Sequence, residues 1–451
     1  MRHRVTTASL SAWVDPAVAY QAICGDAEAA FWLDSGPDAT TGTSYIGLAT
    51  EVVSSFDGPV LDWLGRRIAD SVEGAVPGFS LGWVGWLSYE LRAETLGATG
   101  AYSSRYPLAT WLKVERAVAF DHANRTVTVM ALDGIEEYRA EVEKALLAIV
   151  VAVPELPLAH AGAGSHPVTP TWSYTDAEYL AMILECQHSI TEGDAYQLCL
   201  TTEATVDATP DPVATYLALR SSSPTHHGAL IRAGGVALLS ASPEQFLAVS
   251  PDGVVTTSPI KGTRPRGQTE AGDWRMRTEL AASDKERAEN VMIVDLMRND
   301  IARVSKPGSV DVTKLLEVES YAQVHQLVST VRGQLRDGLN GIDAIRACFP
   351  AGSMTGAPKL AATEILDRLE NRARGIYSGA FGYVGLDGAV DLAMVIRSII
   401  IDSVGSTVGT GGGITALSVP EEELAEAKLK AAALLAVLGV VQRDHEERDH
   451  R

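Results

Sequence analysis

The sequence predicts an α+β fold, in which strands joined as hairpins are flanked by separate helices. Short apolar runs follow one another closely, as at 229–233 and 236–240, and Asp252-Gly253 favours a hairpin turn between two further runs. Helical periodicity is confined to longer segments outside these runs, notably about 276–304. This combination is typical of an α+β protein and disfavours a doubly wound parallel sheet.

The composition is that of a globular protein with a buried core, since 46% of the 451 residues are hydrophobic and 21% are charged. The net charge is 37 − 57 = −20, which repels phosphates. We therefore expect no nucleic acid and no membrane among the partners. Without a signal peptide or an apolar run of the roughly 18 residues that span a bilayer, the sequence predicts a cytoplasmic protein.

A stretch rich in Pro, Gly, Ala and His interrupts the sequence at 156–172, and we expect it to be a linker or surface loop. It separates an N-terminal region, 1–155, from a region at 173–442 that holds nearly all the motifs described below. The N-terminal region contains a strand-like run at 126–131 and a helical stretch at 136–151.

The second region is expected to begin with a helix capped by Thr175 and to continue, after a turn, into a strand at 195–206. Its last helix opens at Ser418, where Ser-Val-Pro-Glu fits a capping box. Between them we expect the two hairpin strands noted above and further strands at 246–249, 254–260, 324–335, 380–385, 393–402 and 406–410.

Two pairs of carboxylates are spaced for a common helix face. Glu286 and Glu289 lie three residues apart in one predicted helix, and Glu423 and Glu426 have the same spacing in the last one. If the two faces meet, four acids provide the hard oxygen ligands that Mg²⁺ prefers. The alternative is that they are ordinary surface acids, which are favoured in a first helical turn.

The strand end SPIKGTRPRG gathers positive charge in an acidic chain. Lys261, Arg264 and Arg266 are placed there to hold an anionic substrate, and an unprotonated Lys261 would also be a nucleophile. The alternative is a solvated strand lysine.

Glycine-bearing segments at 349–359 and 409–415 are expected to be loops whose free N–H groups can bind a carboxylate, although tight turns would look the same. Glu244, after Ser-Pro at a strand start, is a candidate general acid or else a solvated turn residue. Arg397 and Tyr377 lie within apolar strand-like runs, where a buried arginine would need an anionic partner.

Together these segments resemble the chorismate-utilising enzyme family, through a series that occurs in order along the chain: GDAYQLCL, SASPEQFL, PIKGTRPRG, DKERAENVMIVDLMRNDIARV, VHQLVSTVRG, FPAGSMTGAPK, GIYSGAFGYVG, MVIRS, GTGGGI and EEELAEAKLKA. The resemblance covers about 175–440, and FWLDS and LGWVGWLSYEL extend it more weakly into the N-terminal region. It implies one large α+β unit of two packed, mainly antiparallel sheets flanked by helices, with the linker as a surface loop.

The resemblance also implies a role for each candidate residue. Glu289 and Glu426 match direct Mg²⁺ ligands, and Glu286 and Glu423 match a second pair around the metal. Glu244 matches the general acid that helps the C4 hydroxyl of chorismate to leave, and Lys261 matches the nucleophile at C2. The dianionic substrate would be bound by Tyr377, Arg397, Gly411, Gly412, Lys430, Thr355 and Gly356.

Two positions indicate which reaction of the family to expect. Gln197 stands where members that add water carry a lysine base, so the chain resembles the ammonia-using members. PIKGT, with Lys261, resembles the members that aminate C4 and form 4-amino-4-deoxychorismate for p-aminobenzoate and folate biosynthesis. The alternatives are amination at C2, as in the anthranilate-forming members that usually read PIAGT, and a catalytically silent regulatory subunit.

The remaining expectations concern partners and departures from the family pattern. No G-x-C-x-G nucleophile with a later His-x-Glu is present, so ammonia is expected from a glutamine amidotransferase subunit. The N-terminal resemblance implies tryptophan as a ligand near Trp32 to Ser35. Gln326 stands where many members have a histidine, and His325 would face the opposite side of its strand. Cys199 replaces a usual asparagine, and Gln245 a usual arginine.

Overall fold

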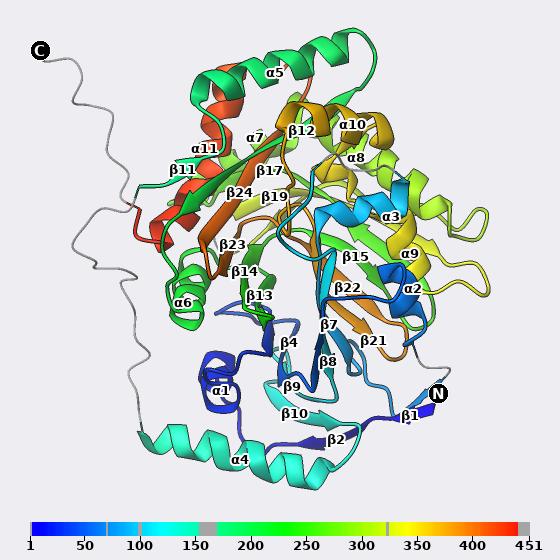
Figure 1. Ribbon diagram of the computed structural model, residues 1–451, viewed down its shortest axis with the longest axis vertical. Coiled ribbons are helices and arrows are strands. Elements are labelled where there is room, and N and C mark those ends of the chain that lie inside the picture. Colours follow the sequence, from blue (N-terminus) through cyan, green and yellow to red (C-terminus); the bar gives the residue numbers. More distant parts are fainter. Residues whose placement is uncertain (1, 69–70, 98–101, 153–168, 322–323, 441–451) are drawn as a thin grey trace, which may run out of the picture.

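A computed structural model describes residues 2–68, 71–97, 102–152, 169–321 and 324–440, and two large sheets form its centre (Figure 1). Within each of these sheets the paired strands run antiparallel, and helices flank them. The predicted α+β class is therefore confirmed.

The larger sheet contains twelve strands within the described residues. Eleven follow one another in space: β11 (Thr171–Trp172), β12 (Gln197–Val206), β24 (Gly405–Ile414), β23 (Ser398–Asp402), β14 (Val236–Ser242), β13 (His227–Ala233), β3 (Ala30–Asp34), β4 (Thr43–Leu48), β9 (Arg116–Asp121), β10 (Thr126–Ala131) and β2 (Thr6–Ser9). A short strand, β20 (Gly356–Ala357), also pairs with β12.

The smaller sheet contains ten strands in the part of the chain that the structure describes. Nine follow in the order β17 (Ile260–Pro265), β19 (Val324–Gln334), β16 (Val254–Ser258), β15 (Gln245–Val249), β22 (Val390–Met394), β21 (Ala380–Gly385), β7 (Gly82–Leu87), β8 (Ala109–Val114) and β5 (Glu51–Val53). The tenth, β18 (Asp311–Ser320), pairs with β19. Two short strands outside both sheets, β1 (Arg2–Arg4) and β6 (Ser71–Glu73), pair in parallel.

Both sheets are built from strands that precede and strands that follow the predicted linker. In the larger sheet β3 pairs with β13, and in the smaller one β7 pairs with β21. Buried side chains from both regions form one cluster between these strands, including Phe31, Trp86 and Ile231. The N-terminal and C-terminal regions therefore share a core, as the single unit predicted from the sequence requires.

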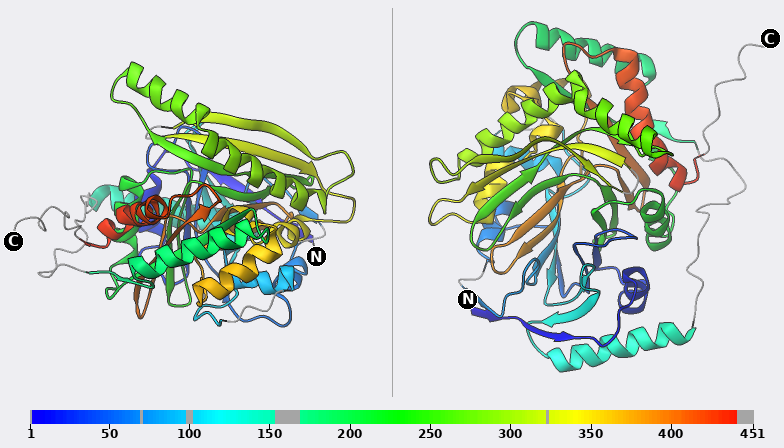
Figure 2. Two further views of the ribbon diagram at one scale, coloured as in Figure 1. Left: turned by 90° about the horizontal axis from the view of Figure 1, so that it is seen from above. Right: turned by 180° about the vertical axis from the view of Figure 1, so that it is seen from behind.

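Helices cover the outer faces and ends of the sheets (Figures 1 and 2). In Figure 1, α1 (Pro16–Ile23) and α4 (Ile135–Ala152) lie at the lower end, and α5 (Asp176–Thr191), α10 (Lys359–Glu370) and α11 (Pro420–Val437) at the upper end. Figure 2 shows α7 (Glu270–Ala282) and α8 (Asp284–Ala302) over the smaller sheet near β19. The others are α2 (Val60–Gly65), α3 (Arg92–Leu96), α6 (Pro212–Ser222), α9 (Gly341–Cys348) and two 3₁₀ turns, η1 (Tyr89–Leu91) and η2 (Gly352–Met354).

Helix ends differ from the prediction at two places. The helix expected at about 276–304 is two helices, because the hydroxyl of Ser283 accepts a hydrogen bond from the Glu286 N–H and caps α8. The capping box at Ser418 is wrong, since Val419 is the N-cap and the Ser418 hydroxyl instead donates to Glu423 Oε1 at 2.7 Å. The expected cap at Thr175 is confirmed, with Glu178 completing the box.

Two predicted strand boundaries are also wrong. The strand expected at 393–402 is divided between the two sheets, because Arg397 has a φ of 50° and the chain crosses from β22 to β23 there. The glycine segment 409–415 was expected to be a loop, yet the glycines continue β24 as far as Ile414 and pair with β12. Of the predicted linker, 156–168 lies outside the described residues, and Thr171–Trp172 forms the edge strand β11.

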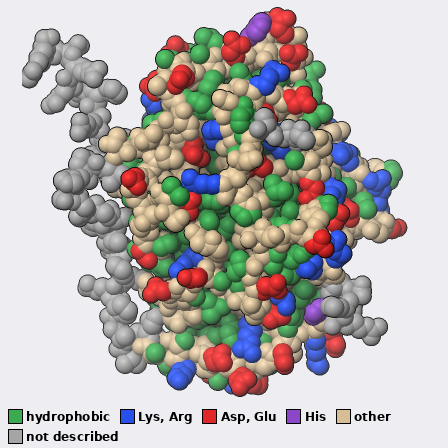
Figure 3. All heavy atoms as spheres, viewed as in Figure 1, with side chains coloured by type: hydrophobic (Ala, Val, Ile, Leu, Met, Phe, Trp, Pro, Cys, Tyr) green, Lys and Arg blue, Asp and Glu red, His purple; other side chains and the backbone are tan. Residues whose placement is uncertain are grey.

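Acidic and basic side chains are interspersed over the face drawn in Figure 3, so the net negative charge is not collected in one patch of that face. None of the helices in the described ranges has both the length and the apolar character needed to cross a membrane.

Candidate active site

A cavity of about 600 Å³ lies where the larger sheet, the end of the smaller sheet and helices α8 and α11 meet. This volume is within the range of small-molecule sites. Strand β17 contributes Lys261, and β24 contributes the run of glycines that follows Thr410. Predicted site residues from four separate elements, β17, β24, α8 and α11, therefore come together in one place.

The cavity is charged but balanced. Five acidic side chains line it, Glu244, Glu286, Glu289, Glu423 and Glu426, and five basic ones, Lys261, Arg264, Lys285, Arg397 and Lys430. The formal charge of the lining is thus 5 − 5 = 0, in a chain whose net charge is −20. A dianionic substrate therefore meets no net repulsion from the cavity walls.

Each carboxylate of the predicted metal set lies beside its own cation. The four pairs and their N–O distances are Glu286–Arg264 at 3.6 Å, Glu289–Lys261 at 3.9 Å, Glu423–Lys285 at 3.1 Å and Glu426–Lys430 at 2.7 Å. The two helix faces do meet, since all four acids line one cavity. Among the described residues, however, no three His, Cys, Asp or Glu side chains converge closely enough to hold a metal ion as they stand.

Burial and charge act in opposite directions on these groups. Burial raises the pKa of Glu289, against the opposing effects of Lys261 and Lys285. Although burial alone would raise the pKa of Glu426, Lys430 holds it below the ordinary value. Hard carboxylate oxygens on facing helices fit the donor chemistry of Mg²⁺, provided that their present cationic partners give way.

Glu244 has the environment of a general acid. It precedes β15, its residue is 8% exposed, and it lines the cavity. Burial raises the pKa of its carboxyl, while a hydrogen bond from Ser353 and the charge of Lys261 act against the rise. A carboxyl of this kind retains its proton to higher pH than an exposed glutamate and can deliver it to a leaving group.

Tyr377 and Arg397 both line the cavity, although neither lies within a strand as predicted. Tyr377 is buried in the turn before β21, and its ring lies against Gly409. Arg397 occupies the crossing between the sheets and is exposed rather than buried, with its guanidinium donating to the Lys430 carbonyl at 3.2 Å. It can therefore reach a bound anion without breaking an ion pair of its own within the described residues.

The glycines of β24 allow close approach to the cavity. Gly411 and Gly412 line it, and Lys430 Nζ donates to the Gly411 carbonyl at 3.0 Å. A Cβ at Gly411 would overlap the Leu200 carbonyl of β12, and one at Gly412 would lie 3.2 Å from Glu423. Backbone, rather than side chains, forms this wall of the cavity.

Thr355, Gly356 and Arg266 are not brought to the cavity surface. The Thr355 hydroxyl donates to the carbonyls of Ala351 and Gly352, and Gly356 pairs with β12, so their contact with substrate stays a prediction. Arg266 turns away to pair with Asp273 at 2.7 Å, which reduces the predicted positive cluster to Lys261 and Arg264.

The strand alternation predicted at β19 is confirmed. Gln326 lines the cavity, whereas His325 faces the opposite way and bonds Asp273 and Ser320. Sequence reasoning missed Lys285, Ser353 and the buried pair Glu370–Arg374. Lys285 directly precedes Glu286 and could have been noticed as a charge on the acidic helix face, and Glu370 and Arg374 have the i,i+4 spacing of a helical ion pair. Nothing local marks Ser353.

A second, smaller cavity of about 70 Å³ lies beside the end of β3. Leu33, Asp34 and Ser35 line it, together with His227 and Asp391. The predicted tryptophan position therefore adjoins a cavity, although Trp32 itself is buried in the core. Gln245, which stands where the family usually has an arginine, donates from its amide nitrogen to Asp391 at 3.0 Å. Its side chain therefore contacts a residue that lines this second cavity.

The two packed antiparallel sheets enclose a cavity lined by five acidic and five basic side chains, and the family model for chorismate binding enzymes matches residues 28–436. The chain belongs to this family.

Similar proteins carry two names. A protein of Streptomyces griseus named aminodeoxychorismate synthase is 39% identical over 97% of this chain, which spans 64% of that relative. A Streptomyces coelicolor protein named anthranilate synthase component 1 is 37% identical over 94% of this chain and 86% of its own length. The crystal structure of anthranilate synthase component I from Streptococcus pneumoniae superposes with a TM-score of 0.72 at 27% identity, covering 96% and 92% of the two chains.

Gly409→Ala tests the wall of the cavity. Its Cβ would overlap the Tyr377 ring and must displace it. We expect kcat/KM for chorismate to fall by up to about 100-fold while the protein remains folded. Gly65→Ala is the control, because a Cβ there meets nothing within 4 Å. Steady-state kinetics and circular dichroism check both variants, and unchanged kinetics in Gly409→Ala would contradict the placement of Tyr377.

The raised pKa of Glu244 predicts a pH dependence. The protonated form is the acid, so kcat/KM for chorismate at constant free ammonia should fall as pH rises through the raised pKa. The falling limb should therefore lie above the pH at which an ordinary glutamate titrates. Glu244→Gln should be slow and lack this limb. If the pH profile of Glu244→Gln falls at the same pH as that of the wild type, the titrating group is another residue.

Proposed function

We propose that this chain aminates chorismate at C4, forming 4-amino-4-deoxychorismate from chorismate and ammonia. The observation that carries the proposal is that an amine, Lys261, and a buried carboxyl of raised pKa, Glu244, face one charge-balanced cavity. The relatives named aminodeoxychorismate synthase support it. A catalytically silent regulatory subunit is disfavoured, because all the groups proposed for catalysis and metal binding are present: Lys261, Glu244, Glu286, Glu289, Glu423 and Glu426.

In the proposed mechanism Lys261 Nζ, as the neutral amine, forms a bond to C2 while the ring double bond shifts and the C4–O bond breaks. Glu244 gives its proton to the departing hydroxyl, which leaves as water. Ammonia then bonds to C4, the double bond shifts back and the C2–Nζ bond breaks. Glu244, now a carboxylate, is placed to accept the proton that the added nitrogen loses.

The carboxylates of the substrate are proposed to lie against the positive groups and backbone of the cavity. Arg397, Lys430 and the Tyr377 hydroxyl, with the N–H groups around Gly411, provide donors for the enolpyruvyl carboxylate. The Arg397 guanidinium donates to the Lys430 carbonyl at 3.2 Å, which places it beside α11.

Mg²⁺ is proposed as the cofactor, held by Glu289 and Glu426 with Glu286 and Glu423 around it. When bound, it would supply positive charge to the ring carboxylate of the substrate. Glu289 and Glu423 are buried beside Lys261 and Lys285, and if these lysines turn to the substrate the two carboxylates would need another cation.

Amination at C2, which would give anthranilate, is the second candidate. It is favoured by the relative named anthranilate synthase component 1, whose length the chain covers to 86%. Lys261 separates the candidates, because a covalent bond at C2 would block amination there.

The proposed partners follow from the resemblance to the relatives named aminodeoxychorismate synthase. This chain spans 64% and 51% of the two Streptomyces relatives named aminodeoxychorismate synthase. We propose that ammonia reaches the cavity from a glutamine amidotransferase component and that the reaction belongs to p-aminobenzoate and folate biosynthesis in the cytoplasm. Tryptophan is proposed as a ligand of the cavity beside Asp34 and Ser35, which equilibrium binding would measure.

Lys261→Ala tests the function. Chorismate, Mg²⁺ and ammonium are supplied, and product mass and pyruvate are both measured. Wild-type protein should form 4-amino-4-deoxychorismate and release no pyruvate. Lys261→Ala should lose that product because C2 is no longer blocked, and residual turnover should give anthranilate with pyruvate. Lys428→Ala, on the side of α11 that pairs with Asp176, is the control.

The proposed function would be wrong if wild-type protein released pyruvate and formed anthranilate. If Lys261→Ala formed 4-amino-4-deoxychorismate at the wild-type rate, only the covalent role of the lysine would be contradicted, and the proposed reaction would stand.

Removal of the metal tests the cofactor. Activity should be lost in EDTA and return with Mg²⁺, and Glu289→Gln and Glu426→Gln should bind Mg²⁺ more weakly by calorimetry. Glu422→Gln, in the exposed first turn of α11, should bind it as the wild type does. Full turnover of Glu289→Gln at low Mg²⁺ would rule out its assignment as a ligand.

A further inference from the structure

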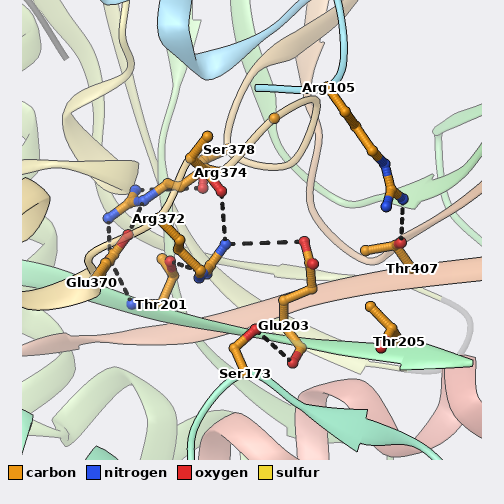
Figure 4. A network of polar contacts seen from close by, with 12 residues as sticks. Arg105, Ser173, Thr201, Glu203, Thr205, Glu370, Arg372, Arg374, Ser378 and Thr407 are labelled. Carbon is orange, nitrogen blue, oxygen red and sulfur yellow. Dashed lines mark hydrogen bonds and ion pairs between the residues drawn. The ribbon is translucent and has the colours of Figure 1, made fainter. Parts of the chain in front are cut away.

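Beneath the cavity lies a buried arginine, Arg374, that the proposed chemistry does not use. It occupies the loop between α10 and β21, three residues before Tyr377, and its side chain is 1% exposed. A buried guanidinium is stable only if its charge and its N–H groups are matched by partners. Figure 4 shows part of the network that matches it.

The charge of Arg374 is matched by Glu370, the last residue of α10. The guanidinium donates from Nε and from one terminal nitrogen to the two carboxylate oxygens, at 2.8 and 2.6 Å. The same carboxylate accepts from the Thr201 N–H of β12 at 2.9 Å. This bidentate pair ties the end of α10 to the strand that supplies Cys199 to the cavity.

The terminal nitrogens of Arg374 also hold two backbone carbonyls of the cavity wall. One donates to Met354 at 2.6 Å and the other to Cys199 at 2.8 Å, and both of these residues line the cavity. The Cys199 N–H donates in turn to the Thr355 carbonyl at 2.8 Å. Because a guanidinium presents its donors at fixed angles, it sets the separation of the two carbonyls, which a lysine ammonium cannot do.

The N-terminal region holds this loop from the other side. Glu90 accepts from the backbone N–H groups of Arg374 and Gly375, at 2.8 and 3.1 Å, and the Tyr89 ring lies 4.4 Å from the guanidinium carbon. Arg372 continues the network to the Thr201 hydroxyl at 2.9 Å, as Figure 4 shows. Segments from three distant parts of the sequence thus meet at one side chain.

We propose that Arg374 is a positioning residue for the chorismate cavity. Its guanidinium fixes the spacing between Cys199 on β12 and Met354 in η2, and it anchors the loop that carries Tyr377. It touches no reacting atom, so it acts through these wall residues alone. The inference rests on the proposed function, because chorismate is the substrate whose position it would set.

Arg374→Lys tests the proposal, with Arg92→Lys as the matched control. Arg92 is also buried and pairs with Asp367 of α10 at 2.5 Å, but it makes no hydrogen bond to a cavity-lining residue among those described. Both variants keep the charge, but Arg92→Lys disturbs one of the described hydrogen bonds and Arg374→Lys several, so thermal stability is measured for both and is expected to fall more in Arg374→Lys. In Arg374→Lys alone, kcat/KM for chorismate should fall on the order of 100-fold, through a higher KM for chorismate and an unchanged KM for ammonium.

Two further readouts separate positioning from general loss of structure. Hydrogen exchange at the amides of Cys199 and Thr201 should be faster in Arg374→Lys and unchanged in Arg92→Lys. In Arg374→Ala, millimolar guanidinium should lower the KM for chorismate, and methylammonium at the same concentration should not. If Arg374→Ala does not fold, the lysine variant carries the test.

The proposal is overturned if Arg374→Lys binds and aminates chorismate as the wild type does. It is also overturned if its kinetics and exchange match those of Arg92→Lys. If the wild type binds chorismate without aminating it at C4, the proposed function fails, and comparison of chorismate binding by wild type and Arg374→Lys still decides the role of Arg374. If the wild type does not bind chorismate, both fail.

Discussion

Charge compensation within one cavity is the constraint on which the rest of this structure depends. Five acids and five bases line the space between α8, α11 and the sheets, and separating buried Glu289 or Glu423 from its lysine would leave a poorly solvated charge. The four metal-set carboxylates belong to two helices, yet their cations come from β17, α8 and α11. The sheets and helices therefore have to meet in one register for the charges to cancel.

Which acids and bases gather at the cavity could be predicted from the sequence, because these residues lie in short segments with recognisable spacing and composition. The two Glu pairs, Lys261 and Glu244 all reach the cavity as expected. The sheet class followed in the same way from hairpin-spaced apolar runs. Local patterns of this kind can be recognised without knowledge of tertiary contacts, since each is complete within one helix turn or one strand.

The parts that could not be predicted depend on contacts between distant segments. The glycine-rich segment from Gly409 has the composition of a loop, but it pairs with β12 and continues a strand. Glycine is required at Gly409 and Gly411 because the Tyr377 ring and the Leu200 carbonyl leave no room for a Cβ. Arg397 sits in an apolar run that reads as one strand, but its positive φ sends the chain from one sheet to the other. Arg374 has Glu370 four residues before it, but nothing local marks its place at the cavity wall, since the carbonyls that it holds lie 20 and 175 residues away in the sequence.

The pairing of acids with bases also limits how far any single residue can be assigned a separate role. Lys261, the proposed nucleophile, has Glu289, a proposed metal ligand, as the partner of its ion pair. A change at Glu289 therefore alters the electrostatic field at Lys261, and a change at Lys261 removes the cation from the ion pair of a buried carboxylate. The two effects are coupled rather than additive. Covalent chemistry and cation binding are joined in this cavity by one electrostatic contact, and the product formed, rather than the rate alone, is what distinguishes a lost nucleophile from a disturbed charge.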